Sequence, residues 1–118
     1  TDARPLHLLV NCAADKDIEA IGEALRTLPR LASVTVPPFR SPRASLPADF
    51  RARAGFAQAE LAPSLADGLR HALECAGPEG LLVVCGSIYL LGELLTLLGC
   101  EEEAMLSFRP VTQQGQTA

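Results

Sequence analysis

The sequence has 118 residues and a formal net charge of −4, with 48% hydrophobic and 20% charged residues. This composition excludes a disordered chain, and the length fits one domain with its own core. The acidic balance and the 4% of aromatic residues argue against a nucleic-acid-binding protein, which needs a basic surface.

The four cysteines, at positions 12, 75, 85 and 100, contain no Cys-x-x-Cys pair. Their spacing therefore excludes the common zinc and thioredoxin-type motifs. Three of them lie in or beside apolar runs, as small buried hydrophobic residues do. The first residues lack the pattern of a signal peptide, so we expect a reducing, cytoplasmic setting.

The amino-terminal half begins with an apolar run at 5–11, which predicts a strand buried on both faces. A helix is expected next, because apolar residues recur at helical spacing (Ile18, Ile21, Leu25 and Leu28). Residues 32–36 predict a second strand that ends at two prolines. Residues 39–53 predict a long loop with a short helix near 47–54, and residues 55–61 a short strand.

The carboxyl-terminal half begins with a capped helix start at 63–67. The apolar face of this helix is expected to hold Leu65, Leu69, Ala72, Leu73 and Ala76. Residues 81–99 carry a single charge and resemble a membrane span by hydropathy. The Cys-Gly-Ser at 85–87 divides them, however, into a β-branched strand at 81–85 and a leucine-rich helix at 88–98. We expect a last strand at 104–108 and a flexible tail at 109–118.

This alternation of strands and helices predicts an α/β fold: a Rossmann-like, mostly parallel sheet with helices on both faces. Ligands of such sheets bind beyond the carboxyl ends of the strands. Two predicted loops at that edge, 12–17 and 86–89, carry polar residues. These loops are the first places to look for a binding site.

Lys16 is the one lysine beside nine arginines, and it stands between Asp15 and Asp17 at the start of a predicted helix. The helix dipole disfavours a cation at this position. The two aspartates could hold its ammonium toward a ligand carboxylate or phosphate, with charge-assisted hydrogen bonds. From spacing alone, a solvated first helical turn explains the same residues more simply.

The Gly86–Tyr89 loop joins a predicted buried strand to a helix. The free N–H groups of a helix N-terminus bind anions, Gly86 permits close approach of the backbone, and Ser87 adds a hydroxyl. Simple capping of the helix by Ser87 is the more economical interpretation. Positions 85 and 89 are not glycine and neither histidine has an obvious acid partner, so we do not expect a hydrolase triad.

Other polar groups give weaker signals. Four arginines lie within residues 40–53 beside a single acid. They could contact a phosphate or an acidic partner, but such a group more often forms a solvated surface. A metal site on His71, Glu74 and Cys75 is not expected, because these few residues share a helix face that should pack. The usual phosphate-binding glycine motifs are missing, so we expect the chain to hold no nucleotide alone.

A family resemblance rests on three segments in order: LLVNCAADKD at 8–17, SPRA at 41–44 and LVVCGSIYLLGE at 82–93. With these segments the sequence resembles the C-terminal domain of folylpolyglutamate synthase/dihydrofolate synthase, of the Mur ligase superfamily. The third segment is the most specific, since Gly-Ser-x-Tyr-Leu-x-Gly-Glu after an apolar strand is long and ordered. The resemblance spans residues 5 to about 98.

The resemblance implies a parent ligase that joins L-glutamate to folate or dihydropteroate through an acyl phosphate, using ATP and Mg²⁺. It implies that Lys16 and Ser87 hold the glutamate carboxylate. Supporting roles are expected for Asp15, Asp17, Gly86 and Tyr89, while no catalytic residue is expected here and Arg43 has no assigned role. The implied domain closes over the ATP-binding domain and so protects the acyl phosphate from water.

The sequence also departs from the family pattern. The family has a strand and a helix before the segment that begins here at Leu6, a P-loop and magnesium ligands in its central domain, and often Gly where Asn11 stands. We therefore expect residues 1–108 to form an incomplete C-terminal-like domain whose partners are the remaining ligase domains.

Alone, the chain is expected to hold no ATP or magnesium, to ligate nothing, and to bind neither nucleic acid nor membrane. The apolar surface that an incomplete domain leaves uncovered predicts self-association. The alternative is a non-catalytic α/β module for binding or oligomerisation.

Overall fold

The protein was analysed as a computed structural model, which describes residues 3–99. Within these residues, four strands form one parallel sheet in the order β3-β2-β1-β4. Their bounds are Leu6–Val10 for β1, Leu31–Val36 for β2, Glu60–Leu61 for β3 and Leu81–Cys85 for β4. The predicted Rossmann-like α/β fold is confirmed.

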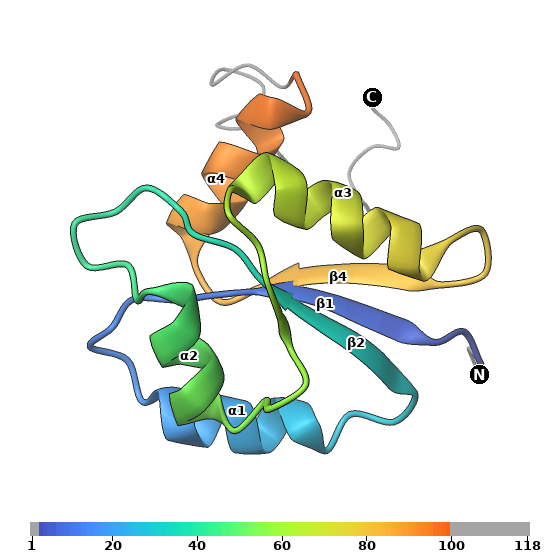
Figure 1. Cartoon of the computed structure of the whole chain (residues 1–118), viewed down its shortest axis with the longest axis horizontal. Helices are drawn as coiled ribbons and strands as arrows, with labels where there is room; N and C mark the ends of the chain where they lie inside the picture. The colour runs from blue at the N-terminus through green and yellow to red at the C-terminus, as the bar shows by residue number, and fades with distance from the viewer. Residues whose placement is uncertain (1–2, 100–118) are drawn as a thin grey trace, which may run out of the picture.

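In the described part of the chain, two helices cover each face of the sheet. The helices α1 (Ile18–Arg26) and α2 (Pro47–Ala54) lie on one face, and α3 (Leu65–Ala76) and α4 (Ile88–Leu97) lie on the other (Figure 1). The change of face follows from the handedness of parallel crossovers. The chain adds β2 and β3 on one side of β1 and then returns through α3 to place β4 on the other side, so the strand order reverses between β1 and β4.

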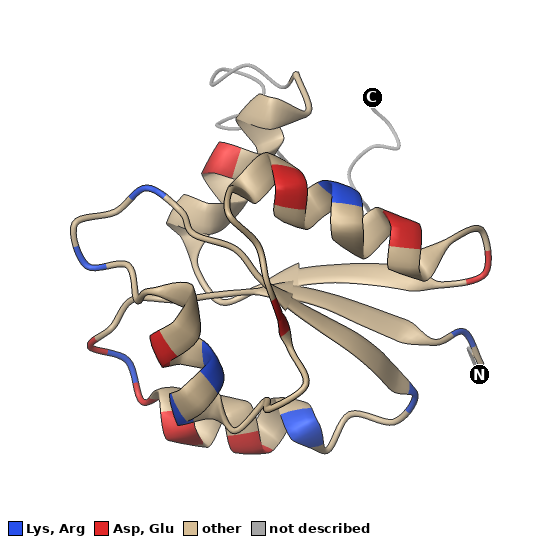
Figure 2. Cartoon of the chain, viewed as in Figure 1, with Lys and Arg blue, Asp and Glu red and all other residues tan. Residues whose placement is uncertain are grey.

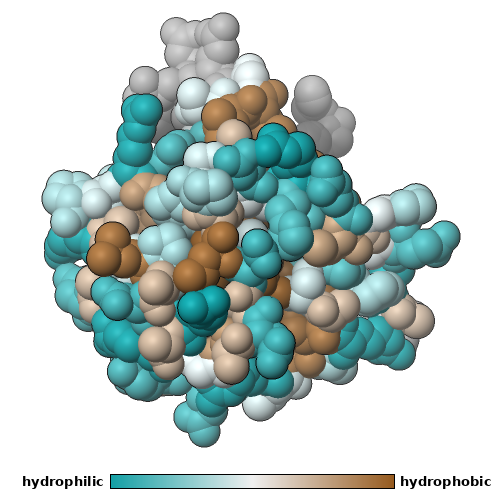
Figure 3. Space-filling model, in the orientation of Figure 1, coloured by the Kyte–Doolittle hydropathy of each residue, from teal (hydrophilic) through white to brown (hydrophobic). Residues whose placement is uncertain are grey.

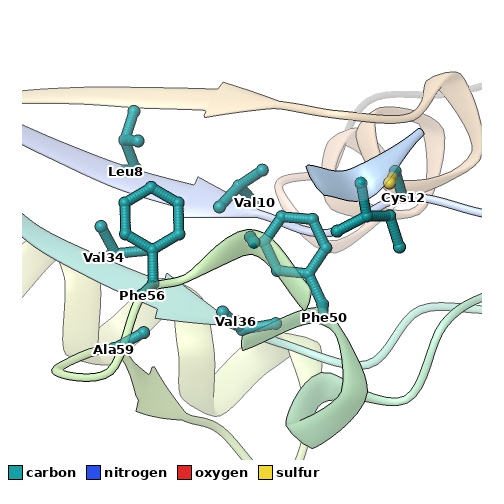
Figure 4. Packing of buried hydrophobic residues seen from close by; sticks show 10 residues of the cluster. Leu8, Val10, Cys12, Val34, Val36, Phe50, Phe56 and Ala59 are labelled. Carbon is teal, nitrogen blue, oxygen red and sulfur yellow. The ribbon is translucent and has the colours of Figure 1, made fainter. Parts of the chain in front are cut away.

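The core consists of one apolar cluster on each face of the sheet. On the α1/α2 face, Leu8 and Val10 of β1 pack with Phe50 and Phe56 (Figure 4). The intervening Leu9 points to the opposite face, where it packs with apolar residues of α3, α4 and the loop after β2 (Leu65, Leu90, Leu94 and Phe39). Successive side chains of a strand alternate between faces, so β1 is buried on both, as predicted.

Two sequence-based expectations are wrong in detail. The third strand has two residues instead of spanning 55–61, because Gly55 takes a left-handed conformation (φ 79°) that ends α2 and starts a turn. Leu73 is 50% exposed, because α3 buries the stripe of Leu65, Gly68, Ala72 and Ala76 against the sheet. The expected strand at 104–108 and tail at 109–118 lie outside the described residues.

The apolar segment at 81–99 forms a strand, a turn and a helix, as predicted. In the range that the structure covers, no helix has the length and apolarity needed to span a bilayer. Leu90 and Leu94 of α4 are buried, whereas Ile88 is 79% exposed and Leu91 and Leu97 are also exposed. Hydrophobic side chains consequently gather on the surface around α4, near the top of the space-filling view (Figure 3).

Candidate functional site

A cavity of about 640 Å³ lies beyond the carboxyl ends of β1 and β4. This position is the point where the strand order reverses, at which open parallel sheets usually bind ligands. The cavity brings together the two loops singled out in the sequence and a third loop, after β2. Its lining consists of Ala13, Lys16, Ser41, Arg43, Val84, Cys85, Gly86, Ser87, Ile88, Tyr89 and Leu91.

Gly86 allows the loops after β1 and β4 to meet. Its φ of 115° is rare for L side chains, and a Cβ built on it would lie 2.1 Å from the carbonyl oxygen of Asn11. Any side chain here would both strain the backbone and push the two loops apart. Gly86 therefore contributes to the cavity wall through its backbone.

Ser87 is the N-cap of α4. Its Oγ accepts hydrogen bonds from the N–H groups of Tyr89 (3.1 Å) and Leu90 (3.4 Å). Because a hydroxyl can accept and donate at once, its proton stays available to a ligand in the cavity. The capping and ligand-binding interpretations of Ser87 are thus compatible in this geometry.

Lys16 lines the cavity, and its ammonium has no hydrogen-bond or ion-pair partner within residues 3–99. The flanking aspartates, which could have held this ammonium, have other partners. Asp17 instead caps α1 by accepting from the N–H of Ala20 (3.1 Å), and Asp15 pairs with Arg43 at 3.1 Å. Both carboxylates are engaged elsewhere, which leaves the Lys16 charge for a ligand.

Asn11 joins the loop after β1 to the loop after β2 by hydrogen bonds. Its fully buried amide donates to the carbonyls of Pro37 (2.8 Å) and Ser45 (3.1 Å). Its Oδ1 accepts from the N–H of Cys12 and from the Ser45 hydroxyl. A short antiparallel bridge between Ala13 and Ala44 adds to these bonds, and together they form a junction between the loops after β1 and β2.

This junction brings Ser41 and Arg43 to the cavity, which the sequence reasoning missed. Figure 2 shows the basic residues of the loop before α2 near the mixed charges of the loop before α1. The SPRA segment at 41–44 is visible in the sequence, but no local pattern places it beside Lys16. The backbone bond from Ala14 N–H to Arg43 O (2.6 Å) does so.

The arginines of 40–53 are not simply a solvated surface. Besides the Arg43 pair, Arg51 donates to the Ala59 carbonyl (3.4 Å) and Arg53 bonds to Glu19 and to the loop that carries Lys16. The Arg53 hydrogen bond lowers the pKa of Glu19 and raises that of Arg53.

In the described part of the chain, no three His, Cys, Asp or Glu side chains come together as a group that could hold a metal ion. His71 contacts Cys75 at 3.4 Å on the surface of α3, and His7 bonds to Ser33 at 2.7 Å on the sheet. Burial raises the pKa of the Cys85 thiol, which keeps it protonated in the cavity wall.

Comparison with known proteins gives matches among solved structures. A bifunctional folylpolyglutamate synthase/dihydrofolate synthase from Yersinia pestis, with AMPPNP and a manganese ion, matches with a TM-score of 0.72 and 20% identity, over 81% of this chain and 22% of that chain. E. coli FolC with ADP matches with a TM-score of 0.71 and 20% identity, over 84% of this chain and 23% of that chain. A Mycobacterium tuberculosis folylpolyglutamate synthase with ADP matches with a TM-score of 0.68 and 29% identity, over 85% of this chain and 25% of that chain.

The chain shares its fold with part of folylpolyglutamate synthase. It spans about a quarter of the length of these enzymes. The structural resemblance expected from the sequence segments is thereby confirmed. No protein-family model and no curated protein matches the sequence.

Proposed function

We propose that this chain is the C-terminal, amino-acid-binding part of an ATP-dependent ligase that adds L-glutamate to folate or dihydropteroate through an acyl phosphate. One observation carries the proposal: Lys16 and Ser87, which are 71 positions apart, line one cavity at the point of strand-order reversal. The fold shared with folylpolyglutamate synthase supports this choice of reaction.

The cavity suits a carboxylate of the incoming amino acid. The Lys16 ammonium supplies a charge-assisted hydrogen bond, typically about 1.5–3 kcal/mol, and the Ser87 hydroxyl a second donor. Gly86 keeps the backbone close, and Tyr89, which is 59% exposed, stands at the rim. In this arrangement Asp15 and Asp17 support the site indirectly, by fixing the loop and the start of α1.

ATP and Mg²⁺ belong to the remaining ligase domains in this proposal. The charged side chains that line the cavity, Lys16 and Arg43, are both cations and would repel a divalent metal ion. The ATP-binding domain would instead close over the cavity, where the exposed Ile88 and Tyr89 offer it an apolar rim. Free thiols at Cys12 and Cys85 suit a reducing, cytoplasmic enzyme.

The binding site is tested by titrating the ¹⁵N-labelled chain with L-glutamate and following its amide resonances. We expect the largest shifts at Lys16, Gly86 and Ser87, and much weaker binding for Lys16→Ala and for Ser87→Ala. Arg40→Ala is the matched control, since it removes one positive charge outside the cavity lining. Unperturbed resonances at high glutamate concentration would refute the proposal and favour the non-catalytic module.

The dependence of the reaction on the other ligase domains is tested with the purified chain, ATP, magnesium, folate and labelled glutamate. We expect no ATP hydrolysis and no glutamate incorporation, because acyl phosphate formation needs the other domains. Incorporation above the no-protein background would contradict this expectation.

Sedimentation tests the expected self-association through the apolar α4 surface, and a monomer at all concentrations would contradict it.

A further inference from the structure

Arg53 links α2 to the loop that carries Lys16. Its Nη1 donates to the Ala14 carbonyl at 2.8 Å, and its Nη2 donates to the Lys16 carbonyl at 3.2 Å. These two carbonyls belong to the first and third residues of the tripeptide 14–16. One guanidinium therefore fixes both ends of the segment whose middle residue, Asp15, pairs with Arg43.

Glu19 holds the guanidinium in the orientation that this contact needs. Its two carboxylate oxygens accept from Nε and Nη2 of Arg53, each at 3.2 Å. Since Glu19 lies in the first turn of α1, the planar group of Arg53 joins the helix and the preceding loop. A lysine could not reproduce this, because an ammonium is a point charge without the fork of a guanidinium.

The base of Arg53 is itself fixed by close helix packing. It lies in the last turn of α2, next to the fully buried Ala54. A Cβ built on Gly22 of α1 would lie 2.1 Å from the Ala54 carbonyl oxygen, so the two helices touch through their backbones. The position of Arg53 relative to the loop is therefore set by the core on this face.

We propose that Arg53 is a positioning residue, which holds the backbone of Lys16 so that its ammonium stays in the cavity. This inference rests on the proposed function, since it assigns Arg53 a role in glutamate binding without contact to the ligand. The ammonium has no partner of its own among residues 3–99, so its location depends on how the backbone is held. The raised pKa of Arg53 and the lowered pKa of Glu19 agree with a persistent pair.

The test compares glutamate dissociation constants by amide titration for Arg53→Ala and Arg53→Lys. We expect affinity to fall about tenfold in both, the usual scale for residues that act through another. Arg51→Ala is the matched control: it removes an arginine from the same helix whose side chain bonds to Ala59, away from the cavity. Hydrogen exchange of the Lys16 and Ile18 amides should rise in the Arg53 variants alone.

A double-mutant cycle separates positioning from general loss of stability. If Arg53 acts through Lys16, then Arg53→Ala should change glutamate affinity little in a Lys16→Ala background. Millimolar guanidinium ion should restore affinity to Arg53→Ala, whereas the same concentration of sodium chloride should not.

The outcomes distinguish the two hypotheses. Absence of glutamate binding by the wild-type chain, or unchanged binding by Lys16→Ala, overturns the proposed function and this inference with it. Weakened binding by Lys16→Ala together with wild-type affinity in Arg53→Ala overturns the inference alone. Additive losses in the double mutant also overturn it, because they mean that Arg53 acts independently of Lys16.

Discussion

Replacing Gly86 with alanine should be far more damaging than an alanine substitution in a loop usually is. The new Cβ would lie 2.1 Å from the Asn11 carbonyl oxygen, where real Cβ atoms essentially never come within 3.0 Å. Relieving this overlap requires β1 and β4 to separate at their carboxyl ends, next to the cavity. The φ of 115° adds backbone strain that glycine avoids.

The magnitude follows from these two costs. A residue held in a sparsely populated backbone region costs about 1–3 kcal/mol. Forcing an extra methyl group into a packed junction costs about 1–3 kcal/mol more. Alanine also reduces the conformational entropy of the unfolded chain, which offsets about 0.4–1 kcal/mol of this destabilisation. We therefore expect Gly86→Ala to lower the free energy of unfolding by about 3 kcal/mol.

Urea unfolding at equilibrium measures this change, with the slope checked for two-state behaviour. Gly92→Ala is the matched control, because Gly92 lies within α4 and its added Cβ meets nothing within 4 Å. That variant should gain about 0.5–1 kcal/mol from helix propensity. A loss below about 1 kcal/mol in Gly86→Ala would refute the claim that backbone contact joins the two loops.

Three further predictions concern the core and the cavity wall. Asn11→Leu should lower the free energy of unfolding by about 2–4 kcal/mol in urea, because buried carbonyls lose their donors; a loss below about 1 kcal/mol would show that water replaces them. Phe50→Ala should cost about 3–5 kcal/mol of unfolding free energy, while Leu46→Ala, at an exposed position four residues earlier, should stay within about 0.5 kcal/mol; equal effects would contradict the assigned core. Alkylation of Cys85 by iodoacetamide should reach half its maximal rate at a higher pH than a free thiol does, since burial raises its pKa. An alkylation midpoint at or below that of free cysteine would contradict this. Because the pKa of the Cys85 thiol is higher in the folded chain, its contribution to the free energy of unfolding is complete below the pKa of the unfolded thiol and is lost as the pH rises through the folded pKa.

Local patterns were enough for most secondary structure. The apolar runs at 6–10 and 81–85 and the spacing around Ile18 and Leu25 have one stable solution each, in which their apolar sides are buried. Ser64 and Ser87 also start the predicted helices by capping them. Caps and periodicity operate within about four residues, so they are readable in the sequence.

Other features depend on partners distant in the sequence. Leu73 fits the same helical periodicity as the buried residues of α3, but its side chain is half exposed because it lies outside the part of the helix that packs on the sheet. The Asn11 amide donates to residues 26 and 34 positions away, and Arg53 donates to Ala14, which is 39 positions away. Neither periodicity nor a motif indicates such a contact before the chain is folded.

The sequence by itself determined the alternation of strands and helices, and the doubly wound sheet that such alternation produces. It also singled out Lys16 and the Gly86-Ser87 turn, because parallel strands bring the loops after them to one edge. Only the tertiary structure decided which groups surround Lys16. Asp15 pairs with Arg43, Asp17 caps α1, and Arg53 of α2 donates to the Lys16 carbonyl. These partners depend on which side chains the packing of the core brings within hydrogen-bond distance.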